Sequence, residues 1–143
     1  MPPIYFFLTI GAMVGLHYFF PIVHWIDDTW GWIGWVPIGL GVSLGLMGDV
    51  LFRRHDTTIK PYEESSSLVT GGPYRITRNP MYLGMTLILL GIGVLCGTLT
   101  PFLEIPLFVA LINYRFIRME EGMLEERFGD EYLYYKTKVR RWI

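Results

Sequence analysis

Long apolar runs separated by short polar segments dominate the chain. Residues 4–26 contain no Asp, Glu, Lys or Arg, and residues 30–52 contain one, Asp49, near the end of the run. Both runs are long enough to cross a hydrocarbon core of about 30 Å as helices. Residues 81–97 and 101–117 form two shorter runs, close to the lower limit for a span. The pattern predicts an all-α, polytopic membrane protein with four transmembrane helices.

Short polar links join these runs in pairs. Residues 27–29 supply a polar turn and a helix cap between the first two runs. Residues 98–100 turn the last two runs into a tight transmembrane hairpin. Pro106 and Glu104 lie early in the last run, so we expect that helix to be kinked or to begin late.

Two polar segments, residues 53–80 and 118–143, complete what we predict to be a single domain of residues 1–143. In the second segment one stripe of positions recurs at steps of three or four: Glu120, Leu124, Phe128, Tyr132, Tyr135 and Val139. This spacing predicts an amphipathic C-terminal helix that lies on a protein or membrane surface. Gly129 would interrupt it and leave two shorter helices.

The charges predict how the chain lies in the membrane. All 12 Lys and Arg residues fall between Arg53 and Arg78 or between Arg115 and Arg141. Four spans place both blocks on one side, and the positive-inside rule assigns that side, with both termini, to the cytoplasm. Three spans would separate the blocks. A net charge of -1 gives no reason to expect nucleic-acid binding.

Neither the cysteine nor the paired histidines predict a metal site. Cys96 is the only cysteine, and it lies in an apolar run. His17 and His24 are seven residues apart on one face of the first run, with no third ligand nearby, so we expect them to pack. Gly41 and Gly45, four apart, are typical of close helix packing.

The most informative stretch is residues 71–84, where a polar loop meets the third run. Asn79 precedes Pro80, which favours Pro80 as the first helical residue. The free backbone N–H groups of such a helix start attract anions, including carboxylates.

The side chains around this helix start could bind a ligand. Arg75 and Arg78 add guanidinium groups, and Tyr74 and Tyr82 add aromatic walls. This mixture suits an amino-acid-like ligand that carries an aromatic base. Alternatively, the two arginines anchor lipid headgroups at the membrane interface.

A second group of charged residues follows the fourth run. Tyr114, Arg118, Glu121 and Glu125 share one helical face by their spacing, whereas Glu120 heads the apolar stripe. A carboxylate on an apolar face needs a partner, because unpaired charge in low dielectric is costly. That partner is either an arginine, which would pin the tail to the rim, or a cationic ligand such as a sulfonium with its ammonium group.

These two stretches carry a family resemblance. The pattern Gly-Pro-Tyr-x-x-x-Arg-Asn-Pro-Met-Tyr-Leu-Gly at 72–84 is followed by Arg-x-Glu-Glu-x-x-Leu-x-x-x-Phe-Gly-x-x-Tyr-x-x-Tyr at 118–135. Together they resemble the isoprenylcysteine carboxyl methyltransferase and phospholipid methyltransferase superfamily. Residues 57–61 and 68–70 are also similar to its small bacterial members, so the resemblance covers roughly residues 45–143.

The resemblance implies an integral membrane enzyme, in a bacterial or archaeal membrane, that uses S-adenosylmethionine and a pocket closed by the C-terminal segment. Its catalytic residues would be Arg118, Glu120 and Glu121. Its cofactor-binding residues would be Gly72, Tyr74, Arg78, Asn79, Pro80, Tyr82, Leu83, Glu121, Tyr132 and Tyr135.

The resemblance also suggests roles. Arg118 would orient a carboxylate or phosphate-bearing acceptor, and Glu120 or Glu121 would hold the cofactor's ammonium group or take a proton from an amine. Asn79 stands where the isoprenylcysteine enzymes carry histidine, which argues against prenylcysteine as substrate. A lipid amine, an isoprenoid or fatty carboxylate, or a small thiol remains as the acceptor. The competing hypotheses are an NADPH-dependent membrane reductase and a non-catalytic lipid-binding protein.

Overall fold

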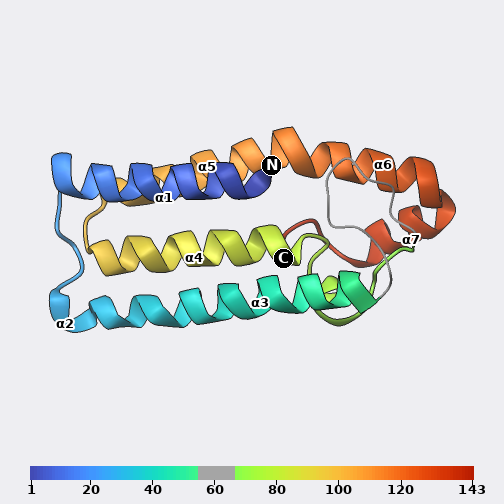
Figure 1. Cartoon of the computed structure of the whole chain (residues 1–143), viewed down its shortest axis with the longest axis horizontal. Coiled ribbons are helices and arrows are strands. Elements are labelled where there is room, and N and C mark those ends of the chain that lie inside the picture. Colours follow the sequence, from blue (N-terminus) through green and yellow to red (C-terminus); the bar gives the residue numbers. More distant parts are fainter. Residues whose placement is uncertain (55–66) are drawn as a thin grey trace.

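The computed structural model describes residues 1–54 and 67–143 as an elongated bundle of helices (Figure 1). Two helices over residues 118–138 extend beyond the bundle at one end, and we call them the cap. The sequence feature at residues 57–61 lies outside the described residues. The helices, in chain order, are α1 (Pro2–Phe19), α2 (Asp28–Gly31), α3 (Trp35–Arg54), α4 (Pro80–Cys96), α5 (Glu104–Ile112), α6 (Arg118–Phe128) and α7 (Asp130–Lys138).

Apolar helices suited to a membrane form the bundle. By length and composition three stretches of the described chain can cross a membrane: Pro2–Phe19, Thr29–Leu51 and Thr100–Phe128. Helix α4 is also apolar, but at 17 residues it is shorter than these. It lies among the other three, packed along the whole length of α3 (Figure 1).

The first helix ends earlier than the hydrophobic pattern predicts. The sequence favours a helix over residues 4–26, but α1 ends at Phe19 and an irregular connector follows. Phe20 leaves helical geometry, with φ -138° and ψ 57°, because Pro21 disfavours the helical region for the residue before it. The connector is held by backbone hydrogen bonds, among them one from Trp25 to the Gly97 carbonyl at 3.1 Å.

The fourth run does not end at residue 117 as predicted. After a 3-10 turn at Thr100–Leu103, α5 passes through one π-helical turn, Asn113–Ile117, directly into α6. Pro106 lies in the first turn of α5, where the N–H that proline lacks has no intrahelical partner to lose. The late start is therefore as expected. The segment that we predicted to be separate from the span begins inside this continuous helix.

The C-terminal stripe forms two helices. Gly129 ends α6 with φ +49°, a conformation that glycine adopts at little cost, and α7 turns back beside α6 (Figure 1). Apolar side chains from both helices and from the segment before α4 share a cluster: Val69, Tyr74, Tyr132, Tyr135 and Val139, with Leu51, Leu68, Leu124 and Phe128 at its edge. The amphipathic stripe therefore packs against other parts of the protein, one of the two surfaces that the sequence left open.

Helices α3 and α4 approach closely at glycines. A Cβ atom at Gly41 would collide with the carbonyl oxygen of Gly84. Seven residues earlier Gly34, which ends the 3-10 turn Trp32–Gly34 just before α3, faces Gly91 in the same way. Seven residues return to almost the same helix face, so the small residues form one seam. The sequence predicted this role for Gly41 and also for Gly45. At Gly45 it is the backbone that lies close to α4, because a Cβ at Gly84 would stand 3.3 Å from the Gly45 nitrogen, whereas a Cβ on Gly45 itself would meet no neighbour within 4 Å.

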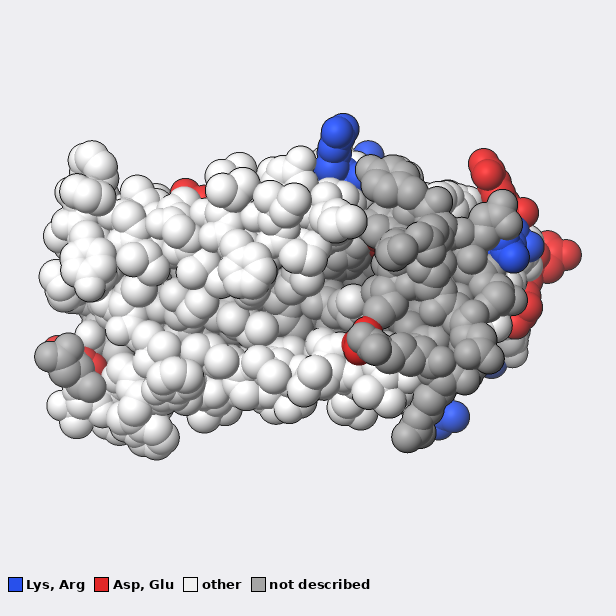
Figure 2. All heavy atoms as spheres, in the orientation of Figure 1, with Lys and Arg blue, Asp and Glu red and all other residues white. Residues whose placement is uncertain are grey.

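The end of the bundle opposite the cap is aromatic. Four tryptophans, Trp25, Trp30, Trp32 and Trp35, are exposed there, as in the aromatic belt of a membrane interface. Figure 2 shows Lys and Arg confined, on the visible face, to the part of the molecule near the cap. His17 packs at the aromatic end, where its Nδ1 lies 2.9 Å from Thr98 Oγ1.

We predict that Gly41→Ala destabilises the protein by about 1–3 kcal/mol, because the new methyl group forces α3 and α4 apart. Gly45→Ala is the matched control, because its methyl group enters open space. Thermal unfolding in detergent, monitored by size-exclusion chromatography, measures the difference in stability. Equal melting temperatures for the two variants would show that the glycine seam does not hold the helices together.

Candidate functional site

A tight turn places the first matched motif at the cap end of α4. Gly72 has φ +56°, a left-handed conformation that a side chain would strain, and it starts a 3-10 turn, Gly72–Arg75. The turn directs Tyr74 inward and leaves Arg75 exposed. Gly72 therefore contributes backbone shape to the site.

Two tyrosines of α7 lock this turn to the cap. Tyr135 donates a hydrogen bond of 2.6 Å to the Tyr74 carbonyl, and Tyr132 is 1% exposed. Burial, reinforced by the Glu121 carboxylate, raises the pKa of Tyr132 to about 12. Burial also raises the pKa values of Tyr74 and Tyr135 above their usual range. All three hydroxyl groups therefore stay protonated at neutral pH.

Helix α4 begins at Pro80, as predicted. Asn79 precedes it, and its side-chain Nδ2 donates a hydrogen bond of 3.0 Å to the carbonyl oxygen of Arg141. The buried Thr77 hydroxyl donates to the same carbonyl at 3.0 Å. Its oxygen also accepts a bond from the Asn79 N–H at 3.1 Å. The helix start is therefore tied to the last residues of the chain.

Glu121 is the centre of a buried charge cluster. It lies on α6 and is 7% exposed. Arg141 binds it with two hydrogen bonds, from Nε to Oε1 at 3.0 Å and from Nη2 to Oε2 at 2.6 Å. Arg78 approaches from the other motif, with Nη1 3.0 Å from Oε1. One carboxylate thus holds two guanidinium groups from distant parts of the sequence.

The neighbouring Glu120 has a different partner. The Tyr82 hydroxyl on α4 donates a hydrogen bond of 2.6 Å to Glu120 Oε1. Tyr82 belongs to the apolar core of the bundle, together with Phe116 and Ile117 of the π turn. Consecutive residues on a helix point about 100° apart, so the two glutamates face different surroundings. Glu120 faces the bundle, and Glu121 faces the cap.

Not every predicted site residue joins this cluster. Arg118 is exposed, and its guanidinium carbon lies 4.3 Å from the centre of the Tyr114 ring, on which it stacks. Leu83 is half-buried on α4, and its backbone N–H closes the first turn of the helix on the Asn79 carbonyl. The remaining predicted residues surround the two glutamates or build the turn beside them.

Three residues of the site escaped the sequence reasoning. Arg141 and Thr77 are described above, and Asn113 accepts a hydrogen bond of 3.1 Å from Arg141 Nη1 through its Oδ1. Asn113 opens the π turn, a feature often found at functional sites. The basic character of the tail was visible in the sequence, but nothing there separated Arg141 from the other tail cations.

Comparison with known families gives one match over most of the chain. The family model described as phospholipid methyltransferase matches residues 30–131. This range contains the whole first motif and the second motif as far as residue 131, so Tyr132 and Tyr135 lie just beyond it. The resemblance inferred from the motifs is therefore confirmed.

Three curated relatives are similar to parts of the chain. An uncharacterized protein of Haemophilus influenzae is 46% identical over 63 residues, which is 44% of this chain and all of that protein. The nickel-cobalt-cadmium resistance protein NccN of Alcaligenes xylosoxydans xylosoxydans is 30% identical over 105 residues. The cobalt-zinc-cadmium resistance protein CzcN of Cupriavidus metallidurans is 32% identical over the same length. Both alignments cover 73% of this chain and 47% of the relative, so the chain spans about half the length of these two proteins.

A solved structure shares the fold. The eukaryotic intramembrane Ras methyltransferase ICMT, an isoprenylcysteine carboxyl methyltransferase, superposes with a TM-score of 0.72 at 24% identity. The superposition covers 99% of this chain and 51% of that one. The family match over residues 30–131 and the apolar helices together establish that the chain is an integral membrane protein of the phospholipid methyltransferase family.

Proposed function

We propose that the protein transfers a methyl group from S-adenosylmethionine to a membrane-associated acceptor. The observation that carries this proposal is the meeting of the two family motifs, through the Arg78–Glu121 ion pair and the Tyr82–Glu120 hydrogen bond. These contacts gather cations, carboxylates and aromatic rings at the point where the apolar bundle meets the polar cap.

The residues fit the amino-acid end of this cofactor. Arg78 Nε and Nη1 are buried and make no hydrogen bond within the described residues, although Nη1 lies near Glu121. Buried donors without acceptors are costly, and two guanidinium groups share the single charge of Glu121. The cluster therefore suits one additional anion, such as the cofactor carboxylate. The nearby Glu120 carboxylate suits the ammonium group.

The cofactor supplies a methyl group on a positively charged sulfur, which makes the methyl carbon electrophilic. The task left to the protein is alignment and the exclusion of water. Arg78 and Glu121 orient the cofactor, and the buried rings of Tyr74, Tyr132 and Tyr135 keep that side of the site dry. For an amine acceptor, Glu120 is placed to accept the proton that the amine loses.

A lipophilic acceptor fits the surroundings of Glu120. Tyr82 and Glu120 lie against the apolar core of the bundle, and large apolar side chains cover the outer faces of α1 and α3. An acceptor embedded in the bilayer reaches this level without leaving the membrane. We propose a lipid amine, an isoprenoid or fatty carboxylate, or a small thiol.

We further propose four spans, with the cap in the cytoplasm. Helix α4 is at the lower limit of length for a span, and its 17 residues rise about 25 Å, which is most of a hydrocarbon core. Four spans place the arginines near α6 and the start of α4 on one side, in agreement with the positive-inside rule. Cysteine labelling at residue 75 and residue 30 from either side of sealed vesicles tests this orientation.

We predict that Arg78→Ala and Glu121→Gln each weaken binding of S-adenosylhomocysteine at least about tenfold, or about 1.4 kcal/mol. Each change removes one member of the cluster that we assign to the cofactor. Isothermal titration in detergent measures the affinity. Titration with NADPH in parallel tests the reductase hypothesis, because only one of the two ligands should bind.

Matched controls separate this effect from general damage. Arg75→Ala removes an exposed arginine from the segment before α4 that also carries Arg78. Glu125→Gln removes an exposed carboxylate from the same helix as Glu121, where it pairs with Lys136 of α7. Both should bind S-adenosylhomocysteine as the wild type does. If the Arg78 and Glu121 variants fold and also keep wild-type affinity, the proposed pocket is wrong.

We also predict a methylated lipid in cells. Lipids from cells with and without the gene should differ by a species that is heavier by one methylene group and depends on Glu121. Mass spectrometry identifies the species and therefore the acceptor. A protein that releases no S-adenosylhomocysteine with any lipid extract would instead support the non-catalytic hypothesis.

A further inference from the structure

The last residues of the chain bind back across the site. We call residues 139–143 the C-terminal strap. Its Arg140 carbonyl accepts a hydrogen bond of 2.9 Å from the Arg78 N–H. The next carbonyl, that of Arg141, accepts from Thr77 and Asn79 at 3.0 Å each. The strap is therefore paired, residue by residue, with the segment that precedes α4.

Apolar contacts anchor the strap at both ends. Val139 belongs to the cluster of the cap, whereas Trp142 packs against the core of the bundle. These two contacts hold the strap at two points along its length. The strap joins the cap to the bundle, and the site lies between them.

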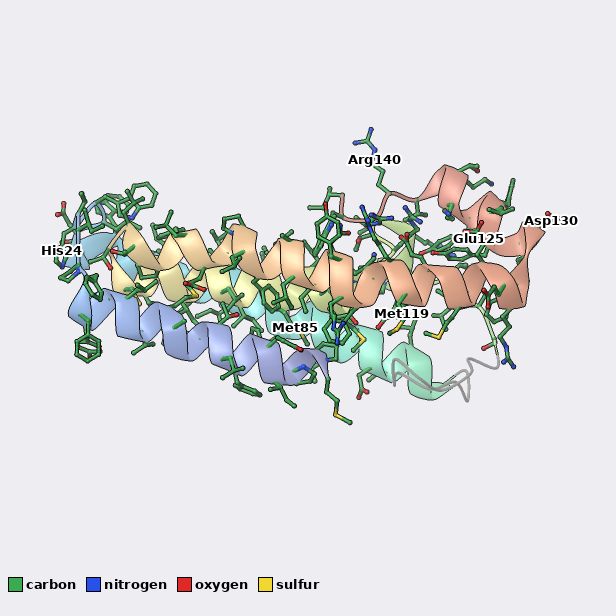
Figure 3. The ribbon with its side chains drawn as sticks, turned by 90° about the horizontal axis from the view of Figure 1, so that it is seen from above. His24, Met85, Met119, Glu125, Asp130 and Arg140 are labelled. Carbon is green, nitrogen blue, oxygen red and sulfur yellow. The ribbon has the colours of Figure 1, made fainter. Side chains whose placement is uncertain are left out.

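The side chain of Arg141 adds a third connection. Its guanidinium group binds both oxygens of Glu121 and, through Nη1, the side chain of Asn113 in the π turn. The strap therefore links three parts of the site: the helix start before α4, Glu121 on α6, and the π turn between α5 and α6. Arg140, by contrast, points away from the bundle, as Figure 3 shows.

We infer that Arg141 is a positioning residue, which holds Glu121 and the Arg78–Asn79 segment in the arrangement that binds the cofactor. A two-pronged guanidinium contact fixes both the position and the rotation of a carboxylate. Because Arg141 occupies both Glu121 oxygens, Arg78 shares one of them, and its buried Nε has no hydrogen bond within the described residues. That donor is then available to a ligand anion.

This role is separate from what the family match supports. The family model ends at residue 131, so the strap lies beyond it, yet the strap contacts three residues of the first motif. The inference rests on the proposed function, because it assigns Arg141 to the same cofactor site.

The test compares Arg141→Gln, Arg141→Lys and the control Arg140→Gln. Both positions lie in the strap, and a substitution at Arg140 keeps the backbone carbonyl that binds Arg78. We expect Arg141→Gln to weaken S-adenosylhomocysteine binding at least tenfold, and Arg140→Gln to bind as the wild type does. Arg141→Lys keeps the charge, but one ammonium group cannot reproduce the two-pronged contact, so its affinity should also fall.

Two further readouts keep the inference testable. Melting temperature in detergent shows whether a variant is folded; if Arg141→Gln does not fold, the folded Arg141→Lys decides. Hydrogen exchange at the Arg78 amide, measured without ligand, should accelerate in Arg141→Gln and stay unchanged in Arg140→Gln. If both Arg141 variants match Arg140→Gln in affinity and exchange, the inference is wrong. A wild type that binds no S-adenosylhomocysteine would refute the proposed function, and the exchange rates would then decide the role of the strap alone.

Discussion

The arrangement of the site depends on the burial of one carboxylate, that of Glu121. A buried charge without a partner costs several kcal/mol, and this cost is avoided only when cations are brought to it with good geometry. Here the cations are Arg78 and Arg141, which lie 43 residues before Glu121 and 20 residues after it. Pairing them with Glu121 forces the start of α4 and the end of the chain onto α6. The cap and the bundle therefore meet at this residue.

The adjacent Glu120 faces the apolar core of the bundle instead. Its partner is the neutral hydroxyl of Tyr82, so the Glu120 charge is not cancelled by a cation in that contact. Two neighbouring carboxylates thus lie in different surroundings: Glu121 is bound by two arginines, and Glu120 lies beside the apolar core. In the function that we propose, the Glu121 cluster binds the cofactor carboxylate, and Glu120 faces the cofactor's ammonium group and the acceptor.

Local signals in the sequence predicted much of this molecule. The apolar runs indicated membrane helices because burial in lipid demands continuous apolar surface and satisfied backbone groups. Asn79-Pro80 predicted the start of α4, and Gly129 predicted the break in the C-terminal stripe, because proline and glycine act on the backbone next to them. The end of α1 shows the opposite case. Pro21 carried the signal, but the length of the apolar run obscured it.

What the sequence determined by itself was the presence of the long apolar helices, the family and the two motifs of the candidate site, because each depends on residues close together in the chain. Only the tertiary structure decided which charges meet. Spacing on α6 grouped Arg118 with Glu121, but Arg118 stacks on Tyr114 and faces outward, while Arg141 takes its place beside the glutamate. Arg141 lies in the irregular segment after α7, where the sequence has no helical periodicity that could predict which way a side chain points. Its position is set by contacts at both ends of the strap, which bring together residues that no local pattern relates.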